Sequence, residues 1–267
     1  MQLLTPVVPH PDAPLARANP VAKLGAAFIV MVALFSSLDW VTAGIVLGGL
    51  LAVVLVSGIS PGVLLRRAWL IGLPAVSIGI FNVVVAAEQS GPTILALGPI
   101  RIGAETAVNG VGLALRLSAI ALAGILALAT SQPTDLADSL VQQLRVSPRF
   151  AVGALAAFRL LPLLALEWQT IAMARRARGI DAGRNPAAAV RLFAGQTLAL
   201  LIGAVRRGTR MAQAMEARGF GARECRTVAR VQRVRASDWG WIVGAAVLGA
   251  VAIGVSLAAG TWRPLIG

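Results

Sequence analysis

Residues 106–129, TAVNGVGLALRLSAIALAGILALA, are the most informative part of the sequence: they form a run of 24 residues in which Arg116 is the only charged one. A helix of this length and composition can cross the hydrocarbon core of a bilayer, which requires about 20 apolar residues. The chain as a whole has 267 residues, 57% of them apolar and 13% charged, with a mean hydropathy of +0.80. Such a composition leaves too little polar surface for a soluble globule. We therefore expect an all-α integral membrane protein.

Apolar runs on both sides of this segment predict four further spans, at about residues 24–38, 41–56, 68–87 and 239–260. The first 22 residues are rich in proline and lack the basic start and apolar core of a signal peptide, so we expect them to be retained as a tail. Trp239, Trp241 and Trp262 suit the aromatic belts at the two ends of the last span. About five transmembrane helices are expected in total.

Positive charge is concentrated in residues 131–237, which carry 17 of the 24 basic residues against six acidic ones. Because loops rich in Arg and Lys stay on the cytoplasmic side, this segment and the N-terminus are expected inside and the C-terminus outside. Arg101 alone disagrees with that orientation.

Arg116 is the exceptional residue inside a span, since an ionised arginine there costs at least ~2.5 kcal/mol on insertion scales. It should therefore face protein or water. Two interpretations are open: an interhelical contact with a backbone carbonyl or with Asn82, and a direct role in transport.

The basic segment is expected to hold two long helices, one from Pro148 to Arg178 and one from Pro186 to Arg218. Each would be about 45–50 Å long at 1.5 Å per residue. Charges interrupt both, so we interpret them as a cytoplasmic pair of amphipathic helices between the fourth and last spans, packed at the inner membrane face. The alternative is a seven-span protein in which both are partly inserted. The apolar stripes expected to pack are Leu161, Leu164, Trp168, Ile171 and Ala172 on the first helix, and Ala204, Gly208, Met211, Ala212 and Met215 on the second.

The ends of these two helices match each other at a constant offset of 40 residues. Residues 172–180 read AMARRARGI and residues 212–220 read AQAMEARGF. Glycine just past a last turn supplies a left-handed C-cap, and the helix dipole favours an arginine beside it. The pattern indicates either two docking tips for a partner or two capped helix ends with interfacial arginines.

These features divide the chain into four expected parts. They are a Pro-rich cytoplasmic tail (1–22), a membrane domain with four spans (23–130), a cytoplasmic domain with two Ala-Arg-Gly tips (131–237), and a C-terminal span with a short external tail (238–267).

Catalytic chemistry lacks its usual residues in this chain. Cys225 and His10 are the only cysteine and histidine, which excludes an intramolecular disulfide framework, an ordinary zinc site and a histidine-based triad. The only lysine, Lys23, does not follow a glycine-rich loop, so nucleotide hydrolysis by this chain is not expected. An integral membrane enzyme would need paired carboxylates or a His/Asp set near the interface, and Glu88 and Glu105, which flank one external loop, do not form such a set in the sequence. We expect no catalytic residue, no metal site and no cofactor.

The basic segment also suits electrostatic binding to anionic lipid headgroups or to RNA. The bilayer is an expected partner. Nucleic acid is not, because the sequence contains no recognisable binding module.

The chain resembles the transmembrane T component of energy-coupling factor transporters, the CbiQ-type permeases, over nearly its whole length. The resemblance rests on the paired motifs Ala177-Arg178-Gly179 and Ala217-Arg218-Gly219. Further agreement lies in residues 19–24 (NPVAKL), 130–148 and 158–162 (FRLLP).

The resemblance implies a non-catalytic scaffold in an ATP-driven importer of a vitamin or of a cobalt or nickel ion, in the bacterial cell membrane. Two cytoplasmic ABC ATPase subunits would bind ATP, and a small membrane S component would bind the substrate. The residues implied in ATPase docking are Ala177, Arg178, Gly179, Ala217, Arg218 and Gly219. The residues implied in support of the coupling helices are Arg159, Pro162, Met211, Met215 and Glu216. The alternative is a conventional ABC permease that binds substrate in its own spans, for which the chain offers mainly Asn82, Asn109 and Arg116.

Overall fold

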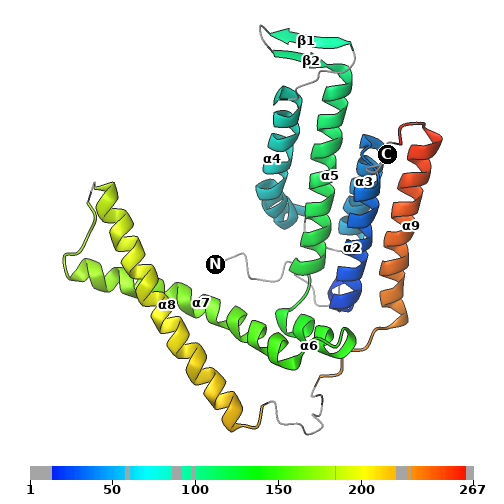
Figure 1. Cartoon of the computed structure of the whole chain (residues 1–267). Helices are drawn as coiled ribbons and strands as arrows, with labels where there is room; N and C mark the ends of the chain where they lie inside the picture. The colour runs from blue at the N-terminus through cyan, green and yellow to red at the C-terminus, as the bar shows by residue number, and fades with distance from the viewer. Residues whose placement is uncertain are drawn as a thin grey trace. The chain divides into compact units, whose positions relative to one another are not determined.

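The computed structural model describes residues 14–57, 61–85, 92–97, 100–183, 185–220, 228 and 230–262. Two compact units are present: a bundle unit, Gln2–Ser139 with Gln232–Gly267, and a two-helix unit, Leu140–Val231. Along the chain (Figure 1) the elements are α1 (Pro14–Arg17), α2 (Pro20–Ser36), α3 (Trp40–Val56), α4 (Pro61–Val85), β1 (Thr93–Leu97), β2 (Ile100–Gly103), α5 (Ala104–Ala129), α6 (Pro133–Gln143), α7 (Pro148–Ala177), α8 (Pro186–Ala217) and α9 (Ala236–Ala258).

The all-α membrane fold class is confirmed. Within the described residues, α5, α7, α8 and α9 are long and apolar enough to cross a membrane, and shorter apolar helices cover Pro20–Ser36, Trp40–Leu55 and Gly72–Val85. One small departure from the all-α expectation is the antiparallel hairpin of β1 and β2 between α4 and α5. The length and composition of α7 and α8 also suit the seven-span alternative. Their placement at the inner membrane face therefore stays a prediction.

Side chains at the helix starts explain several boundaries. Asp39 precedes α3, and its Oδ2 accepts a hydrogen bond from the amide of Thr42 at 2.7 Å. An acceptor at this position satisfies one of the backbone N–H groups that the first turn of a helix leaves without a partner. The capping side chains of this kind are Asn19 for α2, Asp39 for α3 and Asn185 for α8.

The bundle unit is built around α2, α3, α5 and α9. Helix α2 packs against α5 and α9, and α3 packs against the same two helices (Figure 1). Leu34 of α2 and Val46 of α3 are fully buried in the core. Helix α4 packs against α5, so α5 contacts helices on both sides.

Two glycines allow α4 and α5 to approach closely. A Cβ atom on Gly79 of α4 would lie 2.7 Å from the carbonyl oxygen of Gly110 and 2.8 Å from the Cβ of Ala114. A Cβ atom on Gly110 would lie 2.1 Å from Cγ2 of Val83. Small residues at such crossings are typical of membrane helices, whose association depends on close van der Waals packing.

Candidate functional site

Both Ala-Arg-Gly motifs end a long helix with the same backbone geometry. Helix α7 ends at Ala177 and α8 ends at Ala217, and in each case the following arginine is the C-cap residue. Gly179 and Gly219 then have the same left-handed φ of 74°. Glycine is the residue that adopts this conformation without a steric penalty.

Matching hydrogen bonds close the two caps. In the first, the Gly179 amide donates to the Arg176 carbonyl at 2.9 Å and the Ile180 amide donates to the Arg175 carbonyl at 3.0 Å. In the second, the amides of Gly219 and Phe220 donate to the carbonyls of Glu216 and Met215, both at 2.9 Å. This pair of bonds defines a Schellman motif. The prediction that both glycines cap their helices is confirmed.

The two tips project outward from the two-helix unit. All six residues that the sequence analysis assigned to docking are exposed: Ala177, Arg178, Gly179, Ala217, Arg218 and Gly219. Among the expected support residues, Arg159, Met211 and Glu216 are exposed, whereas Pro162 and Met215 are half-buried. Pro162 lies inside α7. An exposed guanidinium at a helix C-terminus can make charge-assisted hydrogen bonds to an acidic or carbonyl-rich surface.

Polar contacts hold α7 and α8 together where they cross (Figure 1). Arg207 Nη2 lies 2.8 Å from Glu167 Oε2, which forms an ion pair between the helices. Gln196, which is buried, donates through Nε2 to the Trp168 carbonyl at 2.7 Å. The indole of Trp168 also meets the ring of Phe193 edge to face, with centroids 5.3 Å apart.

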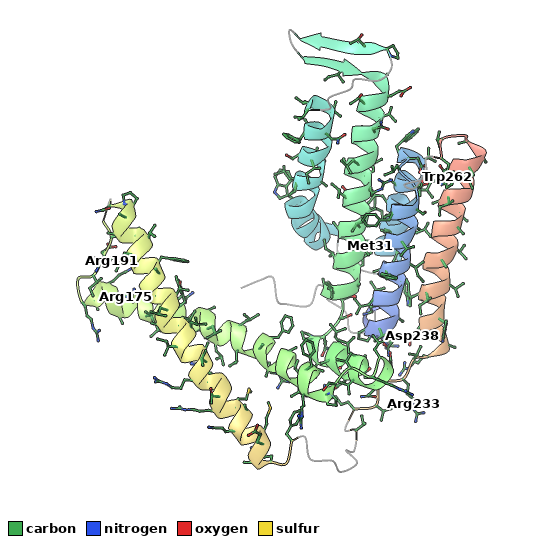
Figure 2. All side chains as sticks on the ribbon, viewed as in Figure 1. Met31, Arg175, Arg191, Arg233, Asp238 and Trp262 are labelled. Atoms are coloured by element: carbon green, nitrogen blue, oxygen red, sulfur yellow. The ribbon has the colours of Figure 1, made fainter. Side chains whose placement is uncertain are left out.

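A second polar contact lies nearer the end of α7. Arg175 donates through Nη1 to the Leu192 carbonyl at 2.8 Å, and Figure 2 shows Arg175 and Arg191 at the same end of the helix pair. Of the stripes predicted to join the helices, Trp168 takes part in these contacts. The contacts of Glu167, Gln196 and Arg207 were not predicted from the sequence. A signal was present, since Glu167 and Arg207 are oppositely charged and separated by the same 40 residues as the tips.

The bundle unit contains a buried polar cluster around Arg116. Its guanidinium donates through Nη2 to the carbonyl oxygen of Ser37, and only 7% of the residue is exposed. Asn82, the other partner considered, is exposed. The interpretation of Arg116 as an interhelical contact with a backbone carbonyl is therefore confirmed.

Asp39 shares this cluster, between α2 and α3. Burial alone would raise the pKa of Asp39, but hydrogen bonds from Ser37, Ser256 and Thr42 outweigh it and hold the pKa below its ordinary value. The carboxylate also interacts electrostatically with Arg116. The cluster thus connects α2, α3, α5 and α9 through one buried negative and one buried positive charge.

Known proteins are similar to this chain over most of its length. Residues 12–228 match the family model CbiQ, which is described as a cobalt transport protein. The chain is 29% identical over 239 residues to the energy-coupling factor transporter transmembrane protein EcfT of Lacticaseibacillus paracasei, which covers 85% of this chain and 89% of the relative. It is 29% identical over 219 residues to EcfT 1 of Listeria monocytogenes, covering 78% of this chain and 81% of the relative. It is 27% identical over 239 residues to EcfT of Lactococcus lactis, which covers 85% of this chain and 88% of the relative.

Proposed function

Because the chain belongs to the CbiQ family, the transmembrane components of energy-coupling factor transporters, we propose that it is the scaffold subunit of an ATP-driven micronutrient importer. In this proposal two cytoplasmic ABC ATPase subunits bind and hydrolyse ATP. Their motion reaches a membrane S component, which carries a vitamin or a cobalt or nickel ion. The chain itself performs no catalysis and binds no cofactor, and it lies in the bacterial cell membrane with its N-terminus in the cytoplasm.

The observation that carries this proposal is the matched pair of exposed tips. Two sites with the same cap geometry suit two partner subunits of similar structure. Each tip presents an arginine, Arg178 or Arg218, beside a small alanine that lets a partner backbone approach closely. A charge-assisted hydrogen bond from either arginine would contribute about 1.5–3 kcal/mol if the partner removed it from water.

The remaining assigned residues have supporting roles in the proposal. Met215 and Glu216 shape the second tip through their backbone carbonyls, which accept the cap hydrogen bonds. Met211 precedes them on the same helix and offers an adaptable apolar surface. Arg159 and Pro162 belong to the first half of α7, where they would anchor and bend the helix.

The proposal is tested by reversing the charge of the tips. We expect Arg178→Glu and Arg218→Glu each to weaken recovery of the ATPase subunits by about tenfold or more when the tagged chain is purified from native membranes. The double variant should abolish both recovery and uptake. Arg206→Glu is the matched control, because Arg206 is also exposed on α8 but lies away from the tip.

Two outcomes would contradict docking through these arginines. One is full recovery of both ATPase subunits with intact uptake by the double variant at normal membrane levels. The other is an equal loss in the Arg206→Glu control, which would indicate a general effect of negative charge on α8. If the chain purified alone with substrate bound, the conventional permease would replace the scaffold as the explanation.

A further inference from the structure

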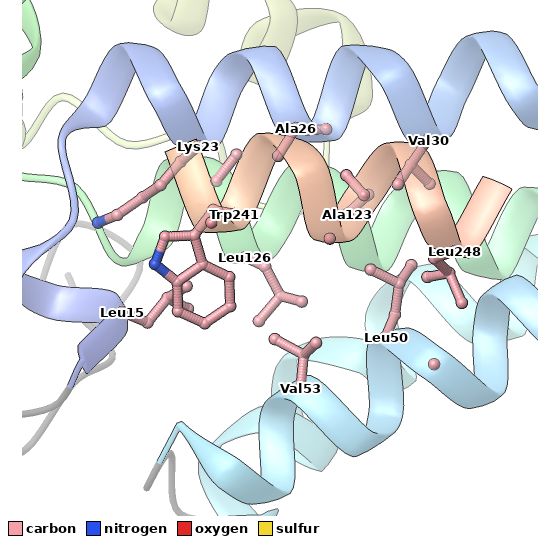
Figure 3. Close-up of a pocket in the computed structure, with 16 residues that line it drawn as sticks. Leu15, Lys23, Ala26, Val30, Leu50, Val53, Ala123, Leu126, Trp241 and Leu248 are labelled. Atoms are coloured by element: carbon pink, nitrogen blue, oxygen red, sulfur yellow. The ribbon is translucent and has the colours of Figure 1, made fainter. Parts of the chain in front are cut away.

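The bundle unit contains a partly open pocket of about 360 Å³ that the proposed function does not use (Figure 3). It lies between α2, α3, α5 and α9. Small residues on these helices create the space, because their side chains do not reach across the bundle. Those lining the pocket are Ala26, Ala27, Gly49, Ala123, Ala127, Gly240, Gly244 and Ala245. Larger apolar residues complete the walls, among them Val30, Leu50 and Leu248.

One end of this pocket differs chemically from the rest. Figure 3 shows the amine of Lys23 and the indole nitrogen of Trp241 at the same end, whereas Val30 and Leu248 lie at the other. The pocket is therefore an apolar chamber with a cation and an N–H donor at one end. This distribution of polar and apolar groups complements an amphiphile with a negatively charged head and an apolar chain.

Lys23 is a buried cation with incomplete hydrogen bonding among the described residues. Only 5% of it is exposed, and Nζ donates to the Thr130 carbonyl at 3.2 Å and to Ser131 Oγ at 3.5 Å. An ammonium group carries three donors, so one more acceptor can be accommodated. Two carboxylates act on it electrostatically, Asp238 and, more weakly, Asp135.

Asp238 is committed to backbone donors rather than to this lysine. It accepts from the Asn19 amide at 3.0 Å and from the Arg235 amide at 2.7 Å. The Asn19 side chain also donates through Nδ2 to the Arg233 carbonyl at 3.5 Å, so this link to residues 233–238 also uses backbone atoms. Lys23 is the charged residue among those that line the pocket, and its remaining N–H donor favours an anionic group at this end.

The position of Lys23 and Trp241 along their helices indicates which class of amphiphile the pocket would hold. Lys23 is in the first turn of α2 and Trp241 is in the second turn of α9, so both lie near the ends of apolar helices. Tryptophan and lysine at such positions lie at the depth of lipid headgroups. Basic pockets between transmembrane helices on the cytoplasmic side bind anionic headgroups. We propose that the pocket holds one acyl chain of an anionic phospholipid, with the headgroup phosphate at Lys23 and Trp241.

The proposal is tested with the full-length chain, purified and delipidated in detergent and observed by native mass spectrometry. The probes are dioleoyl phosphatidylglycerol and dioleoyl phosphatidylcholine, which have identical acyl chains and differ in headgroup charge. We expect one phosphatidylglycerol to bind at least about tenfold more tightly than phosphatidylcholine, which corresponds to about 1.4 kcal/mol.

Gly244→Leu should fill the pocket and lower phosphatidylglycerol affinity about tenfold. A Cβ on Gly244 meets no atom within 4 Å, so the variant is expected to fold. Gly254→Leu is the matched control, since Gly254 is also on α9, has the same open surroundings and does not line the pocket. Lys23→Gln should keep hydrogen-bonding capacity and abolish the preference for phosphatidylglycerol.

Three results would overturn the proposal. Equal binding of the two lipids by the unchanged chain would exclude an anionic headgroup site. Equal affinities of the Gly244→Leu and Gly254→Leu variants would exclude an acyl chain in the pocket. Dimers that disappear in Gly244→Leu alone would indicate that a second copy of the chain occupies it. The comparison of the two glycine variants tests the acyl-chain site even if Lys23→Gln does not fold.

Discussion

Alanine in place of Gly110 should destabilise the bundle unit by separating α4 from α5. The new Cβ would lie 2.1 Å from Cγ2 of Val83 and 2.9 Å from the carbonyl oxygen of Gly79. Carbon atoms in ordinary contact are about 3.5–4.0 Å apart, so the Val83 methyl must move by more than about 1 Å. The second contact is with backbone, which cannot rotate away, and the helices must therefore shift. Overpacking of this kind costs about 1–3 kcal/mol.

Gly124→Ala on the same helix separates this effect from helix propensity. No atom lies within 4 Å of a Cβ built on Gly124, so alanine there should be neutral or stabilising by up to about 1 kcal/mol. Both variants gain the higher helix propensity of alanine. The difference between their free energies of unfolding therefore measures the steric crowding where α4 and α5 cross. We expect that difference to be about 1–3 kcal/mol.

Unfolding in detergent, followed by far-ultraviolet circular dichroism as denaturant is added, measures this difference. A Val83→Ala change in the Gly110→Ala background removes the nearest atom, so the double variant should recover at least about 0.5 kcal/mol relative to additivity. Equal unfolding midpoints for Gly110→Ala and Gly124→Ala would refute the close approach of α4 and α5. Strict additivity with Val83→Ala would refute the assigned contact.

Three further changes probe other parts of the chain. Alanine in place of Gly179 or Gly219 would put a Cβ on a residue in the left-handed conformation, which costs roughly 1–2 kcal/mol at each position. Amide hydrogen exchange should rise in the last turn of the affected helix alone. Unchanged exchange would contradict the assigned cap. Glu167→Gln and Arg207→Gln should each lower the free energy of unfolding by less than about 1 kcal/mol, because the pair is partly exposed. A double-mutant cycle that shows no coupling between them would contradict the ion pair. The lowered pKa of Asp39 means that its ionised form stabilises the fold above its unfolded pKa of about 3.9 and that this contribution is lost as the pH falls through the lower folded value. The stability gap between the unchanged chain and Asp39→Asn should therefore close with acidification below about pH 4, and a constant gap would contradict the assignment.

The helices and the tips were predictable because they depend on local sequence. The five predicted apolar runs overlap α2, α3, α4, α5 and α9, and proline and glycine bracket α7 and α8 close to the expected positions. The left-handed φ of Gly179 and Gly219 follows from the same logic, since a helix end is completed by residues within two positions of the cap. The β-hairpin before α5 was not predicted, because β1 (TILAL) is apolar at four successive positions and β2 (IRIG) alternates over too few residues to be distinguished from a loop.

The sequence by itself thus determined that this chain is a membrane protein, where its helices lie, and that two of them end in matching Ala-Arg-Gly motifs. The tertiary structure alone decided the partners of residues far apart in the chain. Arg116 meets a carbonyl 79 positions away, and Glu167 meets Arg207 across a helix crossing. The pocket at Lys23 likewise depends on how four helices are rotated against one another. The apolar residues of a membrane helix surround it on all sides, so composition specifies that the helix enters the bilayer, whereas close packing specifies which face meets which neighbour.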